Sequence, residues 1–116
     1  MFSLRKKVNN NIEVNVAYDV INENKTNPKL VILDVRTPKE YESERIENAT
    51  NIDYNSKSFK IEVDKLDKNH KYLVYCRSGH RSSNAVKDMK KLGFEDVKNI
   101  SGGLMKWNRK GLPLKQ

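Results

Sequence analysis

Two short, uninterrupted apolar runs constrain the fold of this chain more than any other feature of its sequence. They cover Leu30–Leu33 and Tyr72–Tyr75 and consist of residues that favour β-structure. A strand that is apolar at every position has both faces buried, as in a parallel sheet covered by helices on each side. Shorter candidate strands lie at Ala49–Asp53 and Val97–Ile100. The sequence therefore predicts a parallel sheet at the core of the fold.

Two helices are predicted in the first half of the chain. Asn15 is a candidate N-cap, because it precedes apolar residues at helical spacing, namely Val16, Ala17, Val20 and Ile21. The segment Thr37–Glu40 is a capping box with proline at the first helical position, so we expect a short helix to begin there.

Three more helices are predicted in the second half. Phe59–Leu66 places apolar residues on one helical face, although its first residues also alternate as in a strand. Ser82–Leu92 has a clearer apolar stripe, with Gly93 at the C′ position and Phe94 placed to close a Schellman motif. The last predicted helix covers Leu104–Lys110.

The predicted helices and strands alternate along the chain. Alternation of this kind is typical of an open, mostly parallel α/β sheet of about five strands with helices on both faces. The 116 residues are enough for one domain. We expect residues 1–11 to form an N-terminal arm or edge strand and residues 12–116 to form the domain.

The net charge of +8 raises the question of nucleic-acid binding. Of the 23 basic residues 17 are Lys, and they are spread along the chain without an Arg-rich stripe or a basic run interleaved with aromatics. We therefore expect no nucleic-acid partner and rank that function last. No apolar run is long enough to span a membrane and no signal peptide is evident, so the expected location is cytoplasmic. A processed periplasmic domain would have the same pattern.

Cys76 is the one cysteine of the chain, which excludes an internal disulfide and a polycysteine metal site. His70 and His80 lack a further soft ligand at metal spacing, so we expect no metal. The remaining interpretations of Cys76 are an inert buried thiol, a catalytic nucleophile or an intermolecular crosslink.

The segment around Cys76 favours the interpretation of this residue as a catalytic nucleophile. A buried strand ends at Cys76 and a helix begins near Ser82, and ligands of open α/β sheets bind beyond the carboxyl ends of the strands. A short loop before a helix directs backbone N–H groups inward and binds anions, while nearby cations and the helix N-terminus lower a thiol pKa. The predicted anion-binding residues are Arg77, Ser78, Gly79, His80 and Arg81.

Three segments together resemble the rhodanese family. Cys76–Ser82 resembles the active-site loop C-R-S-G-x-R-S of its single-domain members, and Leu33–Tyr41 resembles its L-D-V-R-x-x-x-E-[FY] segment. Gly102–Pro113 resembles the closing G-G-x-x-x-W-x-x-x-G-[FLY]-P. One segment departs from the pattern, because Glu44–Ile52 lacks the histidine and both glycines of G-H-I-x-G-A-x-N-I. Asn48 is suited to the left-handed conformation of one missing glycine.

The resemblance implies a single rhodanese-like domain that transfers sulfur through a persulfide on Cys76. The implied partners are a small anionic donor such as thiosulfate and a nucleophilic acceptor, which is cyanide, a thiol or a protein. No cofactor is implied. We expect Asp34 and Arg36 to act as a structural group with Glu40, and Ser82 either to bond the persulfide or to cap the helix.

Other functions are compatible with parts of this pattern. A cysteine-dependent phosphatase or arsenate reductase also uses an anion loop, but its signature is C-x5-R, whereas Arg81 follows Cys76 at C-x4-R spacing. A persulfide carrier or a regulatory rhodanese-like binding module is the alternative within the family. Donor, acceptor and oligomeric state do not follow from the sequence.

Overall fold

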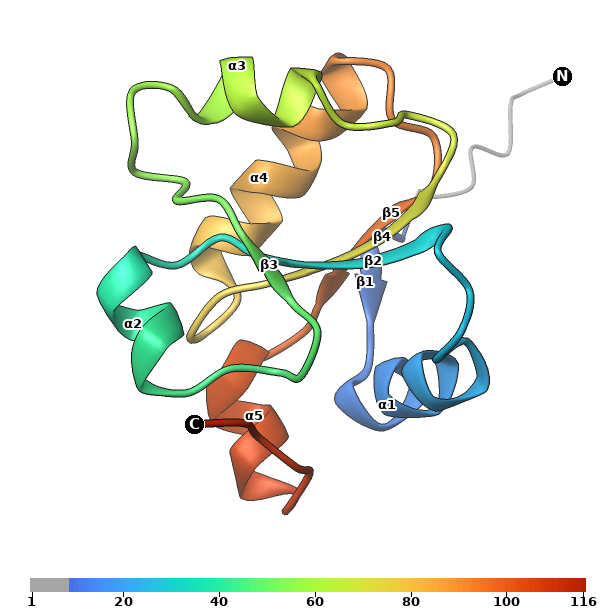
Figure 1. The fold of residues 1–116 in the computed structure, drawn as a ribbon, viewed down its shortest axis with the longest axis vertical. Helices are drawn as coiled ribbons and strands as arrows, with labels where there is room; N and C mark the ends of the chain where they lie inside the picture. Colours follow the sequence, from blue (N-terminus) through green and yellow to red (C-terminus); the bar gives the residue numbers. More distant parts are fainter. Residues whose placement is uncertain (1–8) are drawn as a thin grey trace, which may run out of the picture.

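Helices and strands alternate along the whole of the described chain, residues 9–116 of the computed structural model (Figure 1). The strands are β1 (Asn11–Ile12), β2 (Leu30–Asp34), β3 (Thr50–Asn51), β4 (Lys71–Tyr75) and β5 (Val97–Ile100). The helices are α1 (Val14–Glu23), α2 (Pro38–Ser43), α3 (Phe59–Asp64), α4 (His80–Lys91) and α5 (Gly103–Arg109). This order confirms the predicted α/β alternation.

The five strands form one sheet in the order β1-β5-β4-β2-β3, and all neighbouring strands are parallel. The two apolar runs form the central pair, with Leu33 opposite Val74 and Asp34 opposite Tyr75. Because these strands are parallel, their carboxyl ends meet at one edge of the sheet. Asp34 and Cys76 therefore lie close to each other at that edge.

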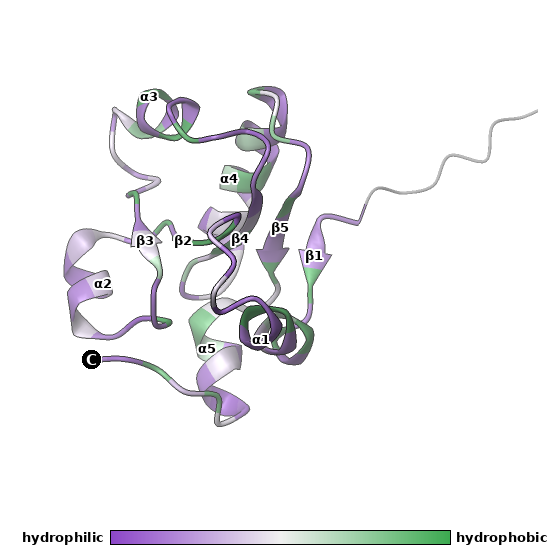
Figure 2. Cartoon of the chain, turned by 45° about the vertical axis from the view of Figure 1, so that its right-hand side comes forward, coloured by the Kyte–Doolittle hydropathy of each residue, from purple (hydrophilic) through white to green (hydrophobic). Residues whose placement is uncertain are grey.

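Helices cover both faces of the sheet. On one face, α3 and α4 contribute Phe59, Val63 and Met89 to a core with Leu33 and Val74. On the opposite face, α1 and α5 contribute residues to a second core, including Val14, Ala17, Leu104 and Trp107. Figure 2 shows hydrophobic segments on α1 and α4 alongside the strands. Burial on both faces explains why β2 and β4 are apolar throughout.

The helix ends show which local signals decide the structure. Thr37 accepts the Glu40 N–H and the Glu40 side chain accepts the Thr37 N–H, so the predicted capping box is confirmed. The Schellman motif is also confirmed, since the Phe94 N–H donates to the Met89 carbonyl at 3.1 Å. The N-cap prediction for Asn15 is wrong. Glu13 is the N-cap, because Val14 is drawn into the core as the first helical residue and is only 1% exposed.

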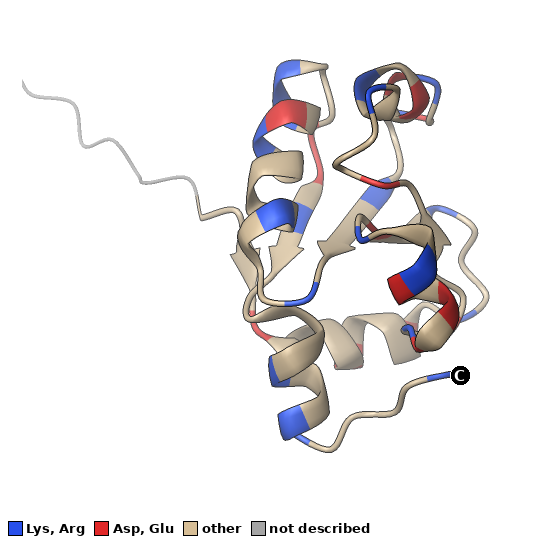
Figure 3. Ribbon diagram, turned by 90° about the vertical axis from the view of Figure 1, so that its left-hand side faces the viewer, with Lys and Arg blue, Asp and Glu red and all other residues tan. Residues whose placement is uncertain are grey.

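The N-terminal part of the chain provides one edge of the sheet. β1 pairs with β5, with Asn11 opposite Asn99, while residues 1–8 of the expected arm lie outside the described residues. Within residues 9–116 no helix has the length and hydrophobicity needed to cross a bilayer. Lys and Arg are spread over several helices and loops in Figure 3, in keeping with the even distribution in the sequence.

Candidate active site

Cys76 is placed by the end of the central strand β4. The thiol is 1% exposed, and the chain turns immediately after it into α4. Gly79 makes this turn with φ +105°, a conformation that side-chain-bearing residues rarely adopt. It lets α4 begin at His80, two residues earlier than the apolar pattern predicts. The loop therefore brings the first N–H groups of the helix close to the sulfur.

Three hydrogen-bond donors of the described chain point at the sulfur atom. The Gly79 N–H lies 3.1 Å from Cys76 Sγ and the Ser82 N–H lies 3.4 Å from it. The Ser82 hydroxyl is the third donor, at 3.3 Å. All three groups are uncharged, and Ser82 is fully buried. A sulfur atom surrounded by donors in this way is a good place for negative charge.

The pKa of Cys76 reflects a competition between burial and these donors. Burial raises the pKa, because it removes water from the thiolate. The side chain and N–H of Ser82 oppose it, as do the backbone groups of Gly79 and Ser78, and together they lower the pKa below its ordinary value. The loop therefore favours the nucleophilic thiolate, mainly through hydrogen bonds.

Arg81 has a partner of its own. Its guanidinium forms a two-pronged ion pair with Glu40 of α2, at 2.8 and 3.1 Å. The hydrogen bond from Arg81 lowers the pKa of Glu40 to about 2. This ion pair connects two segments 41 residues apart and links α2 to the start of α4. Arg81 thus joins the two sides of the site, and its charge also lies close enough to interact with Cys76.

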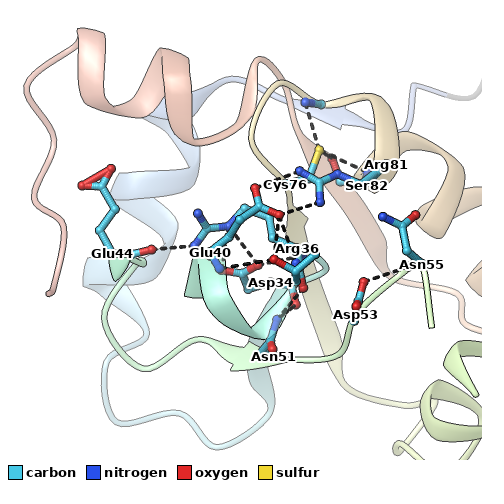
Figure 4. A network of polar contacts seen from close by, with 12 residues as sticks. Asp34, Arg36, Glu40, Glu44, Asn51, Asp53, Asn55, Cys76, Arg81 and Ser82 are labelled. Atoms are coloured by element: carbon cyan, nitrogen blue, oxygen red, sulfur yellow. Dashed lines mark hydrogen bonds and ion pairs between the residues drawn. The ribbon is translucent and has the colours of Figure 1, made fainter. Parts of the chain in front are cut away.

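A second ion pair lies under the site, between Asp34 and Arg36 (Figure 4). The two side chains approach to 2.7 Å and are 0% and 4% exposed. Arg36 also donates to the Glu44 carbonyl at 2.6 Å. Asn51 donates to the carbonyls of residues 34 and 36, at 3.0 and 2.9 Å. We call residues 34–51 the bracing segment, because these bonds fix its path beside the loop.

The other predicted anion-binding residues form the rim of the site. Arg77, Ser78 and His80 are exposed. Arg77 makes no side-chain hydrogen bond or ion pair with any residue of the described range 9–116. It borders a hollow of about 220 Å³ between α2 and α5, which Met105 and Asn108 also line. An exposed cation at this position is available for an anionic ligand.

The glycines of the closing motif support the loop from behind. A Cβ atom on Gly103 would lie 2.5 Å from the Cys76 carbonyl oxygen, so only glycine fits there. This close approach allows Leu104 and Met105 to donate their N–H groups to the carbonyls of Cys76 and Arg77, each at 2.9 Å. The start of α5 therefore holds the loop backbone in place.

The segment that departs from the family pattern keeps the backbone conformation expected of it. Asn48 has φ +69°, which confirms that it takes the left-handed conformation. The Ile46 N–H donates to the buried Tyr75 hydroxyl at 3.1 Å, and Arg45 forms an antiparallel bridge with Lys115. Asn48 therefore makes the left-handed turn for which a glycine is usual.

Asn99 is the residue near the sulfur that sequence reasoning missed. It lies in β5, is 5% exposed, and its side-chain oxygen accepts a hydrogen bond from the Ser82 hydroxyl at 2.5 Å. The single proton of this hydroxyl is therefore shared between Asn99 and the sulfur. The available signal was an asparagine inside the strand candidate Val97–Ile100, since a buried amide requires hydrogen-bond partners. A strand of four residues is too short for that signal to stand out.

The rhodanese-like domain model matches residues 17–110, so the chain belongs to the rhodanese-like domain family. A sulfurtransferase of Allochromatium vinosum is 32% identical over 85 residues, which cover 73% of this chain and 78% of the relative. The chloroplastic thiosulfate sulfurtransferase 16 of Arabidopsis thaliana is 31% identical, with 94% of this chain and 95% of the relative covered. Family and relatives together support sulfur transfer in general.

Solved structures agree with the fold. A rhodanese-related protein of Thermoplasma volcanium has a TM-score of 0.75 and 28% identity, covering 90% of this chain and 96% of that one. The Alr3790 protein of Anabaena has a TM-score of 0.76 and 26% identity, covering 90% and 81%. The match spans only 55% or less of the length of five other curated relatives, so the activities of those whole proteins do not transfer directly.

Proposed function

We propose that this protein is a sulfurtransferase of the thiosulfate type, acting through a persulfide on Cys76. The observation that carries the proposal is the arrangement of three uncharged donors around the sulfur of the only cysteine. Such donors stabilise a thiolate before the reaction, and they also suit the negative charge of a persulfide after it.

The reaction consists of two displacements. In the first, the Cys76 thiolate attacks the outer sulfur of thiosulfate, the S–S bond of the donor breaks, and sulfite leaves with the bonding electrons. In the second, an acceptor such as cyanide or a thiolate attacks the outer sulfur of the persulfide. The bond between the two sulfurs breaks, its electrons return to Cys76, and the thiolate is restored. Neither step requires a cofactor.

The charged residues have separate tasks in this proposal. Arg77 on the rim attracts the anionic donor, since its guanidinium is exposed and offers a fork of N–H groups to an oxyanion. Arg81 keeps α2 and α4 together through Glu40 and adds positive charge near the sulfur. His80 and Ser78 complete the rim. The proposed acceptor is a thiol or a protein. The cytoplasmic location of the protein stays a prediction.

A phosphatase or arsenate reductase remains the competing reaction, and loop length argues against it. The loop closes with Arg81 five residues after Cys76, and Gly79 and Ser82 donate directly to the sulfur. A phosphoryl group has three equatorial oxygens and requires a wider ring of donors. A persulfide carrier that passes sulfur to a partner protein would use the same first step.

Intact-protein mass spectrometry after exposure to thiosulfate tests the proposal. We expect the mass to rise by one sulfur atom, and a reductant should remove the addition. Cys76→Ser should show no addition while its circular dichroism spectrum stays native. An addition that persists in Cys76→Ser would contradict the persulfide site. Efficient, Cys76-dependent hydrolysis of an aryl phosphate by the wild-type protein would favour the competing reaction.

A further inference from the structure

The hydroxyl group of Ser82 lies between two hydrogen-bond acceptors. It donates to the Asn99 side-chain oxygen at 2.5 Å and lies 3.3 Å from the sulfur of Cys76. A serine hydroxyl has one proton, so it cannot give a full hydrogen bond to both acceptors. Ser82 and Asn99 are both buried, and they therefore depend on each other rather than on bulk water. A stronger hydrogen bond to Asn99 means a weaker one to the sulfur.

The orientation of the Asn99 amide follows from its other end. The amide nitrogen donates to the Asn11 side-chain oxygen at 2.9 Å, which leaves the amide oxygen facing Ser82. The backbone of Asn99 is held separately, because its N–H donates to the Asn10 carbonyl at 2.6 Å. A buried amide oxygen is costly without a donor, and the Ser82 hydroxyl supplies one. The Asn99 oxygen is therefore a persistent competitor for the Ser82 proton.

Two other donors to the sulfur do not depend on Asn99. They are the backbone N–H groups of Gly79 and Ser82, at 3.1 and 3.4 Å. The Ser82 hydroxyl is thus the donor whose strength is set by a side chain outside the Cys76–Ser82 segment. A hydrogen bond to a charged acceptor is stronger than one to a neutral acceptor. Weakening this donor therefore disfavours the thiolate relative to the neutral thiol.

We propose that Asn99 is a positioning residue that holds the Ser82 proton on its own side-chain oxygen and thereby limits the hydrogen bond from this hydroxyl to the Cys76 sulfur. A thiolate loses intrinsic nucleophilicity as the pKa of its thiol falls, and attack is fastest when this pKa lies near the ambient pH. Asn99 thus preserves nucleophilicity that a third full hydrogen bond would remove. As a part of sulfur transfer, this role rests on the proposed function.

The test is the pH dependence of Cys76 alkylation by iodoacetamide, which reports one thiol because the chain has one cysteine. Asn99→Leu removes the acceptor with little change in side-chain volume and leaves the Ser82 proton to the sulfur. Asn10→Leu is the matched control. It makes the same exchange just before β1, where the side-chain oxygen has no hydrogen-bond partner within residues 9–116.

We expect Asn99→Leu to have opposite effects on the two limbs of the pH profile. Below the thiol pKa, the alkylation rate should rise up to about tenfold, as for one strengthened hydrogen bond to a charged atom. Above that pKa, the rate should fall about threefold, because the thiolate of a more acidic thiol is a weaker nucleophile. A mere opening of the site would raise the rate on both limbs. Asn10→Leu should match the wild type.

The effect of Asn99→Leu should require the hydroxyl of Ser82. In the Ser82→Ala background, Asn99→Leu should cause no further change of the profile. Ser82→Ala alone should slow alkylation below the thiol pKa by about a few-fold at most, because Asn99 already takes part of the proton. The charged groups around the sulfur stay the same in every variant, namely Arg77, His80, Arg81, Glu40, Asp34, Arg36 and Lys106.

Three results would overturn the proposal. An unchanged profile in Asn99→Leu would show that Asn99 does not compete for the proton. A shift that persists in Ser82→Ala would show that the effect bypasses the hydroxyl, and an equal shift in Asn10→Leu would show a general change at the sheet edge.

A second variant covers a failure to fold. If Asn99→Leu loses its native circular dichroism spectrum, Asn99→Val serves instead, because valine also lacks an acceptor and suits a strand. Loss of the native spectrum in both variants would assign Asn99 a structural role and overturn the proposal. A wild-type protein without thiosulfate activity would contradict the proposed function and leave this test intact.

Discussion

The Cys76–Ser82 loop and the bracing segment lie side by side at the carboxyl edge of the sheet, yet different kinds of interaction hold them. In the loop, the sulfur is surrounded by backbone N–H groups and a hydroxyl. In the bracing segment, hydrogen bonds to backbone carbonyls are joined by two ion pairs, one buried between Asp34 and Arg36 and one partly exposed between Glu40 and Arg81. Only uncharged donors contact the reactive sulfur, whereas the structure around it is also held by ion pairs.

This difference changes the task assigned to the arginines. From the sequence, Arg77 and Arg81 would both raise the thiolate fraction of Cys76. In the structure, the hydrogen-bond donors of Ser82, Gly79 and Ser78 lower the pKa of Cys76 most. Arg81 forms an ion pair with Glu40, and Arg77 lines the hollow at the edge of the site. Variants in the two regions should therefore have separable effects on stability and on the thiol.

The largest expected effect comes from breaking the buried ion pair. Arg36→Met leaves the Asp34 carboxylate buried without its partner and should cost about 3–5 kcal/mol of folding free energy. Urea unfolding measures this loss. Lys68→Met is the control, because the Lys68–Asp64 pair is exposed and should contribute about 1 kcal/mol or less. Similar losses in the two variants would contradict the structural role of the buried pair.

A substitution at the start of α5 that displaces the loop should have the next largest effect. In Gly103→Ala the new methyl group meets the Cys76 carbonyl, so the loop must shift, and a displacement of about 1 Å is enough to reduce turnover about 100-fold. Gly111→Ala is the matched control, since Gly111 also has a positive φ but open space around it. Thiosulfate:cyanide turnover compares the two. Equal activity would show that the close approach of α5 does not position the loop.

Removing the partly exposed ion pair should have a moderate, pH-dependent effect. Glu40→Gln should cost about 1–2 kcal/mol at neutral pH, between the values for exposed and buried pairs. Arg81 lowers the pKa of Glu40 to about 2, so this stabilisation is complete above the ordinary pKa of the carboxyl and is lost as pH falls toward 2. Urea unfolding between about pH 7 and 3 should therefore show the wild type and the variant converging in acid. A constant difference would contradict the ion pair.

The smallest effect is expected at the rim. Arg77→Ala should raise the KM for thiosulfate a few-fold, equivalent to about 1 kcal/mol, because the guanidinium is solvated. The pH profile of alkylation by neutral iodoacetamide should stay nearly unchanged, since the groups that lower the pKa of Cys76 most are the hydrogen-bond donors of Ser82, Gly79 and Ser78. Steady-state kinetics measures the KM of the variant and the wild type, and alkylation measures the pH profile of the thiol in both. A shifted alkylation profile would place Arg77 among the groups that stabilise the thiolate.

Most of the fold follows from local sequence signals. The apolar runs predict β2 and β4, and the Thr37–Glu40 box and the Gly93–Phe94 motif predict two helix ends with their hydrogen bonds. Local signals fail where packing decides. Val14 enters the core and moves the start of α1 ahead of Asn15, although asparagine is the better N-cap. Helix existence is thus encoded locally, whereas the first residue depends on tertiary contacts.

The site is less predictable than the fold, because its contacts are distant in the sequence. Cys76 and Ser82 are identifiable within one short segment of the sequence. The partnership of Glu40 with Arg81 spans 41 residues, and the contact of Ser82 with Asn99 spans 17. Asn99 carries no local pattern, since it occupies one position of a short strand. Such pairs follow from the order of the strands in the sheet.

Because Cys76 is the one cysteine of the chain and its thiolate is favoured, the protein has a particular response to oxidation. Peroxide converts a thiolate into a sulfenic acid, which a second cysteine of the same chain often resolves as a disulfide. Cys76 has no such partner in this chain, so its sulfenic acid must condense with an external thiol, releasing water and forming a mixed disulfide. Further oxidation gives the sulfinic acid and ends the cycle. In the persulfide the outer sulfur is the reactive atom. Oxidation of the loaded enzyme would therefore occur on the sulfur that is transferred, and the sulfur of Cys76 would stay intact.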